Sequence, residues 1–416
     1  MRFLRALAIT MTLVALGLAP DARAAAPRAD LSRLVIVGDS LSAGFQNGSL
    51  LGTQQVHGYA SLVARQAGVP LPLPEIAYPG IPSVLTLVDP GPPPLIVEAS
   101  GVSTGRVDPL IQPLNLAVPG ARVVDALDTR PDSGFQDLTD LVLGLPGLLG
   151  GVSRSQVEWA EVLAPTTIFV WIGNVDALGA AIGGDASLLT PVADFEIAYA
   201  ELMRRLTATG ATIIVGNIPD VTAIAFLTSA EDLAELIGAP LDVIGPVLGI
   251  GAGDYVLPDA VAVIATQGVT GPLPADLILD ATEVAQIRRA VDRFNKVIEG
   301  QAKAHHAAVV DVHGLLEVAQ KRGLVVGRQR LTTEFLGGLF SLDGIHPTNT
   351  GYAILANEFI DTLNRRFGAR LPPVNEEEVL AADPLVFESS SAPSHGHGYG
   401  HVHVNTAREL RWLFNH

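Results

Sequence analysis

The stretch that decides the fold reads LVIVGDSL and occupies residues 34–41. Its first four residues are apolar and mostly β-branched, and a glycine follows at once, which predicts a short buried strand that runs into a turn. Two later stretches repeat this pattern, at residues 167–172 and 212–215, and a third β-branched run, interrupted by Asp311, lies at residues 308–312. Because each run is continuous rather than alternating, each is typical of a parallel strand that is covered on both faces.

Helical patterns separate these predicted strands. Residues 195–206 and 287–298 carry apolar side chains at helical spacing. Asp280 is placed to cap the second of these helices, with Glu283 as its capping-box partner. A last helical pattern covers residues 352–367. This alternation of strands and helices predicts an α/β fold with a parallel sheet between two layers of helices.

Three stretches do not fit the alternation. Residues 68–114 are rich in proline and predict a long surface excursion. Residues 221–279 are apolar but broken by glycine and proline, and we interpret them either as extra core or as a hydrophobic cap over a pocket. Residues 374–416 have mixed polarity and predict a loosely attached tail. The sequence therefore predicts one α/β domain over residues 25–373 with two long insertions.

The N-terminus has the pattern of a secretory signal. Arg2 and Arg5 precede an apolar run at residues 6–19, and an Ala-x-Ala site stands at residues 22–24. The run is shorter than the ~20 residues that span a bilayer. We therefore expect residues 1–24 to be a cleaved signal peptide, with export to the periplasm or the medium and no integral membrane span in the mature chain.

The composition narrows the function classes. The formal net charge is −17 at pH 7, which argues against binding to nucleic acids or to anionic membrane surfaces. Hydrophobic residues make up 48% of the 416 residues, which is ample for a buried core, and there is no cysteine. An exported form must therefore be stable without disulfides.

Residues at two distant places have the chemistry of a nucleophile and its base. Ser40 directly follows the first predicted strand, and ligands in open α/β sheets bind at the carboxyl ends of strands. A serine hydroxyl is a weak nucleophile and needs a base within reach. Asp343 stands three residues before His346 and can hold one imidazole nitrogen while the other takes the serine proton. Position 42 is Ser, so the nucleophile does not lie in a G-x-S-x-G motif.

Four segments resemble the sequence blocks of the GDSL, or SGNH, hydrolase family. They are residues 38–42 (GDSLS), 115–121 (NLAVPGA), 173–176 (GNVD) and 343–347 (DGIHP). The resemblance extends over about residues 33–367. It implies a flavodoxin-like three-layer α/β/α sandwich, hydrolysis of carboxylic esters through an acyl-enzyme, and no cofactor.

The resemblance also implies an oxyanion hole. Its donors would be the backbone N–H groups of Ser40 and Gly120 and the asparagine of the third block. In this chain the family's asparagine position holds Val175, and the neighbouring Asn174 can present its amide if the loop is shifted by one residue. Loss of one such donor typically costs about 10²–10³-fold in rate. The alternatives are that the backbone N–H groups act alone or that the enzyme is slow.

The substrate is less well defined by the sequence. The apolar insertion and the scarcity of tryptophan, with three in the chain, favour an acyl chain over a sugar, so we expect hydrolysis of lipid-like esters. One alternative is a glycan acetylesterase or acyltransferase that uses the same triad. Another is a binding protein that kept the fold but lost most of its catalytic rate because of Val175.

We predict no metal in the site. The only metal-binding pattern is compositional, in the histidines of the tail (His395, His397, His401 and His403).

Overall fold

A parallel sheet forms the centre of the computed structural model, which describes residues 29–91, 94–132 and 137–386. Its four strands have the order β1-β4-β5-β9 and confirm the four predicted apolar runs. The strands are β1 (Leu34–Gly38), β4 (Thr167–Trp171), β5 (Thr212–Gly216) and β9 (Ala308–Val310). The fourth strand ends earlier than we expect from sequence because Asp311 caps the following helix, where its side chain accepts the N–H of Gly314.

The order of the strands creates a switch point beside β1. Leu34 pairs with Thr167 of β4 on one side, and on the other side Ile36 makes an isolated parallel bridge to Asn115. The chain after β1 therefore first runs to the Asn115 side of β1 and then returns to form β4 on the opposite side. In open α/β sheets, ligands bind at the carboxyl ends of the strands at such a point. We therefore expect the functional site in the loops that follow β1 and β4.

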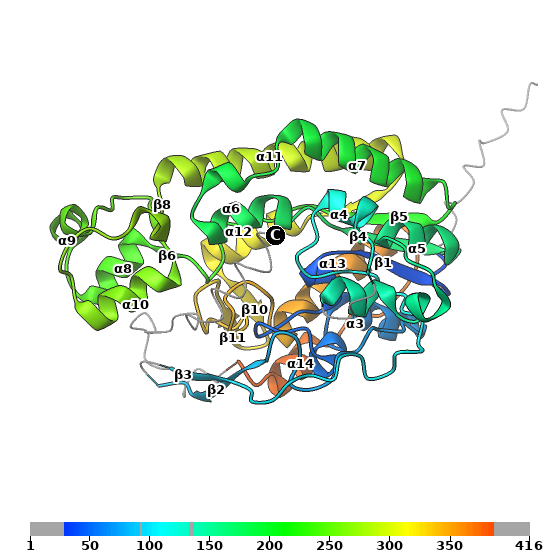
Figure 1. The fold of residues 1–416 in the computed structure, drawn as a ribbon, viewed down its shortest axis with the longest axis horizontal. Coiled ribbons are helices and arrows are strands. Elements are labelled where there is room, and N and C mark those ends of the chain that lie inside the picture. The colour runs from blue at the N-terminus through cyan, green and yellow to red at the C-terminus, as the bar shows by residue number, and fades with distance from the viewer. Residues whose placement is uncertain (1–28, 92–93, 133–136, 387–416) are drawn as a thin grey trace, which may run out of the picture.

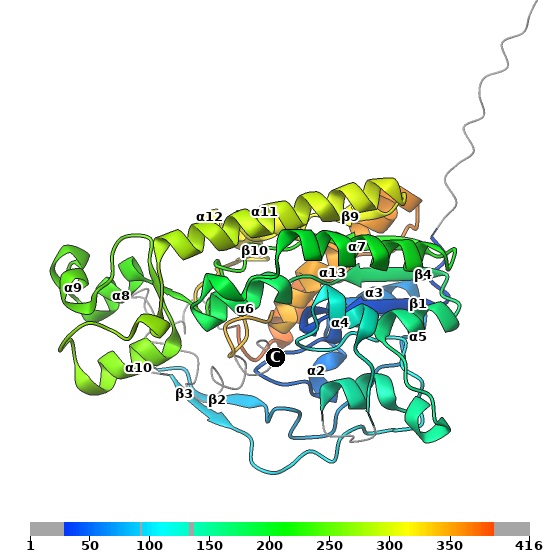
Figure 2. The same cartoon turned by 45° about the horizontal axis from the view of Figure 1, so that its top comes forward.

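Helices cover both faces of the sheet and complete the predicted three-layer sandwich (Figures 1 and 2). On one side lie α4 (Val123–Asp128), α5 (Gln156–Val162), α7 (Val192–Thr207) and α11 (Ala281–Ala304); on the other lie α3 (Tyr59–Ala67) and α13 (Asn349–Phe367). Asp280 and Glu283 form the predicted capping box of α11. Helix α13 begins three residues earlier than predicted because Thr348 caps it, accepting the N–H of Gly351.

The segment 221–279 forms a lobe at one end of the molecule (Figure 1). It contains α8 (Ala230–Ile237), α9 (Leu241–Leu248), α10 (Pro258–Gln267), β6 (Thr228–Ser229), β7 (Tyr255–Val256) and β8 (Ile278–Leu279). Most of its buried apolar side chains, such as Leu233, Ile244 and Leu248, pack against one another in a core separate from that of the sheet, while Leu257 and Leu279 belong to the core of the sheet. Of the two interpretations of this segment, the packing therefore supports extra core for most of its length.

The segment 68–114 contains an antiparallel hairpin of β2 (Leu85–Asp89) and β3 (Leu95–Glu98). In both views it lies on the side of the molecule away from α7 and α11 (Figures 1 and 2). The remaining short elements are α1 (Ser40–Ala43), α2 (Gly52–Gln55), α6 (Val175–Gly183), α12 (Val312–Arg322), β10 (Leu324–Val326), β11 (Gln329–Leu331) and α14 (Glu376–Ala382).

The first part of the predicted tail is not loosely attached. Asp383 is buried and accepts hydrogen bonds of 2.8 Å from both the N–H and the hydroxyl of Thr350, in the first turn of α13. Val374 and Leu385 are buried as well. The predicted signal peptide at residues 1–24 and the histidines of the tail lie outside the described residues. No helix within the described ranges is long and apolar enough to cross a bilayer.

Candidate active site

The chain turns sharply between β1 and α1, and this turn presents Ser40. A Cβ atom at position 38 would lie 2.4 Å from the Ser42 hydroxyl oxygen and 2.6 Å from the carbonyl oxygen of Trp171, so only glycine fits there. Asp39 then caps α1 by accepting the N–H of Leu41 at 3.1 Å. Ser40 is thus the first residue of a short helix at the carboxyl end of β1.

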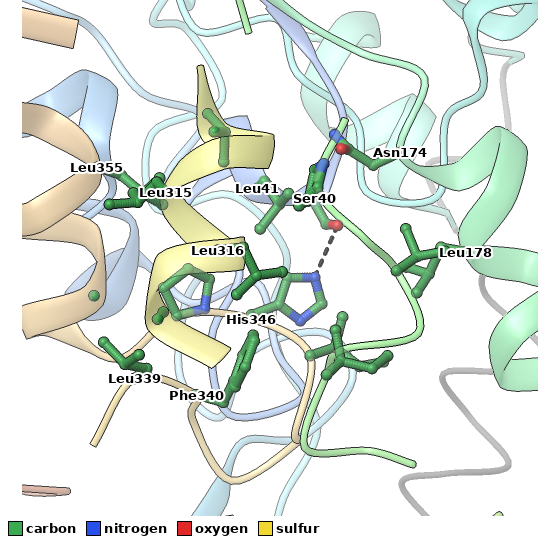
Figure 3. Close-up of a pocket in the computed structure, with 18 of the residues that line it drawn as sticks. Ser40, Leu41, Asn174, Leu178, Leu315, Leu316, Leu339, Phe340, His346 and Leu355 are labelled. Carbon is green, nitrogen blue, oxygen red and sulfur yellow. Dashed lines mark hydrogen bonds between the residues drawn. The ribbon is translucent and has the colours of Figure 1, made fainter. Parts of the chain in front are cut away.

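The structure brings Ser40, His346 and Asp343 together. The imidazole Nε2 of His346 lies 2.8 Å from the Ser40 Oγ (Figure 3). Its Nδ1 lies 2.9 Å from Oδ2 of Asp343. All three side chains are buried, and the ring of Phe45 packs on the imidazole at 4.7 Å between centroids. This is the arrangement in which an imidazole can take a proton from a hydroxyl while a carboxylate fixes its orientation.

The carboxylate of Asp343 is held by several donors. Oδ1 accepts the backbone N–H groups of Ile345 at 2.9 Å and His346 at 2.8 Å, and Oδ2 accepts that of Gly48 at 2.8 Å. Burial on its own would raise the pKa of Asp343, but the charge of His346 and these hydrogen bonds outweigh it and hold the pKa below its usual value. The carboxylate therefore stays ionised.

The turn that supplies the Gly48 N–H was not identified from the sequence. Asn47 and Gly48 have φ angles of 52° and 70°, as two-residue hairpin turns require. Asn47 also bonds the loop of the aspartate: its N–H donates to the Ser341 hydroxyl at 2.9 Å, and its side-chain oxygen accepts the N–H of Leu342 at 3.1 Å. The Asn-Gly pair signals a turn, but no sequence pattern shows that this turn reaches a loop nearly 300 residues away.

The second sequence block holds the backbone on both sides of Ser40 through hydrogen bonds. The amide of Asn115 donates to the carbonyl of Ser42 at 2.8 Å, and the N–H of Val118 donates to the carbonyl of Gly38 at 3.1 Å. Gly120 follows with a φ of 84°, which only glycine adopts without strain. Within the described ranges, the backbone N–H groups of Ser40 and Gly120 have no acceptor. Both are therefore unused donors near the end of β1.

The third sequence block lies at the end of β4, where α6 begins. Asn174 precedes the helix, and its amide nitrogen donates to Oδ2 of Asp39 at 2.8 Å. Its side-chain oxygen is buried and has no partner among the described residues. Val175 lines the same pocket as Ser40 and offers no side-chain donor. One N–H of Asn174 is thus committed to Asp39, and only its second remains for a ligand.

Asp39 is fully buried, and burial raises its pKa to about 7, although the hydrogen bonds from Asn174 and Leu41 oppose the shift. A carboxyl group with a raised pKa binds more protons in the folded state than in the unfolded state. The free energy of unfolding should therefore fall as the pH rises between the ordinary value of 3.8 and about 7. This component is on the order of 4 kcal/mol when fully developed.

We expect Asp39→Asn to remove this fall in the free energy of unfolding with rising pH. Urea unfolding of the wild type and the variant between about pH 4 and pH 8 measures it. The wild type should lose stability relative to the variant across this range. Parallel pH profiles for the two proteins would show that Asp39 does not titrate there.

An apolar pocket opens beside Ser40 and His346 and encloses about 100 Å³. Leucine and isoleucine side chains from α6, α12, α13 and the loop before α13 form its walls: Ile354 and, labelled in Figure 3, Leu178, Leu315, Leu316, Leu339 and Leu355. The segment 221–279 contributes only Val221 and Ile224, at its beginning. The pocket is therefore shaped for an apolar group and is walled chiefly by α12 and α13.

A sandwich fold with a hydrogen-bonded Ser–His–Asp set beside the carboxyl ends of its strands is the arrangement of an α/β hydrolase. The model of the GDSL-like lipase/acylhydrolase family matches residues 34–359, so the chain belongs to this family and is a GDSL-type carboxylic ester hydrolase. No curated protein matches the chain.

Several solved structures are similar to the chain at low identity. LAE5, an α/β hydrolase enzyme from the metagenome of Lake Arreo in Spain, has 15% identity and a TM-score of 0.36, covering 80% of this chain and 95% of its own. Axe2, an acetyl-xylooligosaccharide esterase from Geobacillus, has 13% identity and a TM-score of 0.38, covering 80% and 94%. The psychrotrophic esterase EstA from Pseudoalteromonas has 14% identity and a TM-score of 0.35, covering 80% and 97%.

Proposed function

We propose that this protein is an exported serine esterase that hydrolyses lipid-like acyl esters, with Ser40 as the nucleophile. The observation that carries the proposal is the continuous hydrogen-bond chain from Ser40 through His346 to Asp343 at the mouth of an apolar pocket. Export rests on the signal-peptide pattern at residues 1–24, which would leave Ala25 as the first residue of the mature chain.

The proposed reaction has two halves. The Ser40 Oγ attacks the ester carbonyl carbon while Nε2 of His346 takes the hydroxyl proton. The tetrahedral oxyanion is held by the unused N–H groups of Ser40 and Gly120 and by the second amide N–H of Asn174. The imidazolium then gives its proton to the leaving alcohol. Water, deprotonated by the same imidazole, releases the carboxylate and restores Ser40.

Asn174 can be tested as the side-chain donor. We expect Asn174→Ala to lower kcat at least tenfold with little change in KM, because the donor acts only on the charge that develops in the transition state. Val175→Ala is the matched control, since it truncates the neighbouring pocket residue without removing a donor. Steady-state kinetics on one p-nitrophenyl ester suffice. Unchanged turnover in Asn174→Ala would leave the oxyanion to the backbone N–H groups.

The pocket predicts a preference for longer acyl chains. Each methylene that enters an apolar pocket gains about 0.8 kcal/mol, so kcat/KM should rise about fourfold per methylene from acetate until the pocket is full. Leu315 lies on α12 and is a half-buried residue of the pocket wall, so Leu315→Trp should narrow the pocket. We expect this variant to lose at least about tenfold in the ratio of octanoate to acetate kcat/KM.

A p-nitrophenyl ester series from acetate to dodecanoate measures this preference. Leu315→Ala is the control that enlarges the pocket at the same position, and it should keep or extend the preference for long chains. Activity on acetate alone, with no response to Leu315→Trp, would contradict the lipid proposal. It would instead favour the glycan acetylesterase or acyltransferase.

A further inference from the structure

A second, larger cleft lies apart from the pocket at Ser40. It has a volume of about 750 Å³ and is lined by residues of three segments, 80–83, 101–109 and 141–149. None of its lining residues lines the pocket of the triad. The size falls in the range of small-molecule sites, which is roughly 300–1,000 Å³. The reaction described above makes no use of this cleft.

The cleft contains a buried positive charge without a paired carboxylate. Arg106 lines it, and only 6% of the residue is exposed. Its guanidinium donates to the carbonyl oxygens of Leu145 at 2.6 Å and of Ile111. No carboxylate in the described part of the chain forms an ion pair with it; Asp108 acts on it only at longer range. Burying a charge is costly unless it is paired.

The guanidinium retains donors that the protein does not use. An arginine has five N–H groups. Two of those of Arg106 bond to carbonyl oxygens, and its Nε, which is itself buried, has no partner among the described residues. Burial lowers the pKa of Arg106 to about 10, so it stays charged at neutral pH. The Nη atoms therefore keep two N–H groups, enough for a carboxylate.

The walls of the cleft are mainly apolar and its rim is exposed. Ile81, Pro82, Leu141 and Leu145 are among the lining residues. At the rim, Val102 is 91% exposed and Leu149 is 61% exposed. A single buried cation among apolar walls suits a ligand that has one anionic group on an apolar body. A small hydrophilic anion such as phosphate would leave these walls uncovered.

We propose that this cleft is a binding site, separate from the triad, for an organic carboxylate with an apolar body, of the fatty-acid type. The carboxylate pairs with Arg106 and the apolar body lies along the segments 101–109 and 141–149. Binding at this site does not require hydrolysis, so the proposal stands or falls independently of the esterase activity.

A decanoic acid that carries a diazirine group tests the site on the intact protein. Irradiation followed by peptide mass spectrometry shows which segments are labelled. We expect labelling in residues 101–109 and 141–149, reduced at least about tenfold when the carboxylic acid is replaced by the matching alcohol. Equal labelling of these segments by the alcohol, or labelling confined to the triad pocket, would overturn the proposal.

Two kinds of variant assign the labelling to Arg106. Arg106→Gln should abolish it in both segments, while labelling of the triad pocket persists and shows that the protein is folded. Val102→Asp and Val102→Lys are two variants that introduce opposite charges at the same exposed position. Because the position is exposed, neither should disturb folding. We expect the aspartate to weaken labelling about threefold and the lysine to preserve or strengthen it. Identical labelling in both Val102 variants, or complete competition by an equal concentration of inorganic phosphate, would count against an amphipathic carboxylate.

Discussion

Replacing Ser40 by alanine is expected to lower kcat on p-nitrophenyl esters by about 10⁴–10⁶-fold while KM changes little. The hydroxyl lies 2.8 Å from Nε2 of His346, so it is the atom that the imidazole can activate. Without it no acyl-enzyme forms, and only the oxyanion donors and the apolar pocket remain to assist attack by water. Because the serine and the histidine act as one unit, His346→Ala should lose about as much, and the double variant little more.

A fluorophosphonate probe distinguishes a native protein that is an active serine esterase from one that has lost catalysis. It reacts covalently only with an activated serine, so the wild type should be labelled rapidly, His346→Ala slowly and Ser40→Ala not at all. A wild type that resists labelling would favour the binding-protein alternative, in which Val175 has cost the protein its rate. Labelling that persists in Ser40→Ala would place the nucleophile elsewhere.

The strands and layers could be predicted because their signal is local. A continuous apolar run is expected to be buried, and the four such runs, three of them followed by glycine, became the four strands of the sheet. The apolar segment 221–279 shows the limit of the same reasoning. Hydrophobic composition predicts burial, but it does not predict the packing partner, and most of the buried residues of this segment pack in a core of their own.

The candidate site could be predicted only in part. The two motifs supply Ser40, Asp343 and His346, but the groups that hold them come from distant positions. The N–H of Gly48 reaches Asp343, and the carboxylate of Asp39 binds Asn174 at the end of another strand. These contacts depend on tertiary packing and leave no periodic signal. The docking of Asp383 on α13, at the end of a segment of mixed polarity, was missed for the same reason.

Asp343→Asn should lower kcat by about 10⁴-fold although the side chain keeps its shape. The carboxylate accepts the Nδ1–H of His346 at 2.9 Å and so leaves Nε2 to receive the proton from Ser40. An amide can turn its NH₂ group toward Nδ1, which favours the tautomer with the proton already on Nε2. Ser341→Ala is the matched control, since it removes a weaker contact of 3.2 Å to the same carboxylate, together with the acceptor of the Asn47 N–H, and should cost far less activity.

The same substitution should also show that Asp343 is ionised, through the pH dependence of the free energy of unfolding. Its pKa is lowered in the folded protein, so ionisation stabilises the fold at pH values above the ordinary 3.8 and this contribution is lost as the pH falls below it. The free energies of unfolding of the wild type and Asp343→Asn should therefore converge on acidification and separate toward neutral pH. A wild-type stability that instead fell relative to that of Asp343→Asn as the pH rose above 3.8 would mean that the aspartate is protonated in the folded state, and a neutral partner could not stabilise the imidazolium that the reaction requires. A difference that stayed constant with pH would mean that folding leaves the pKa of Asp343 unshifted.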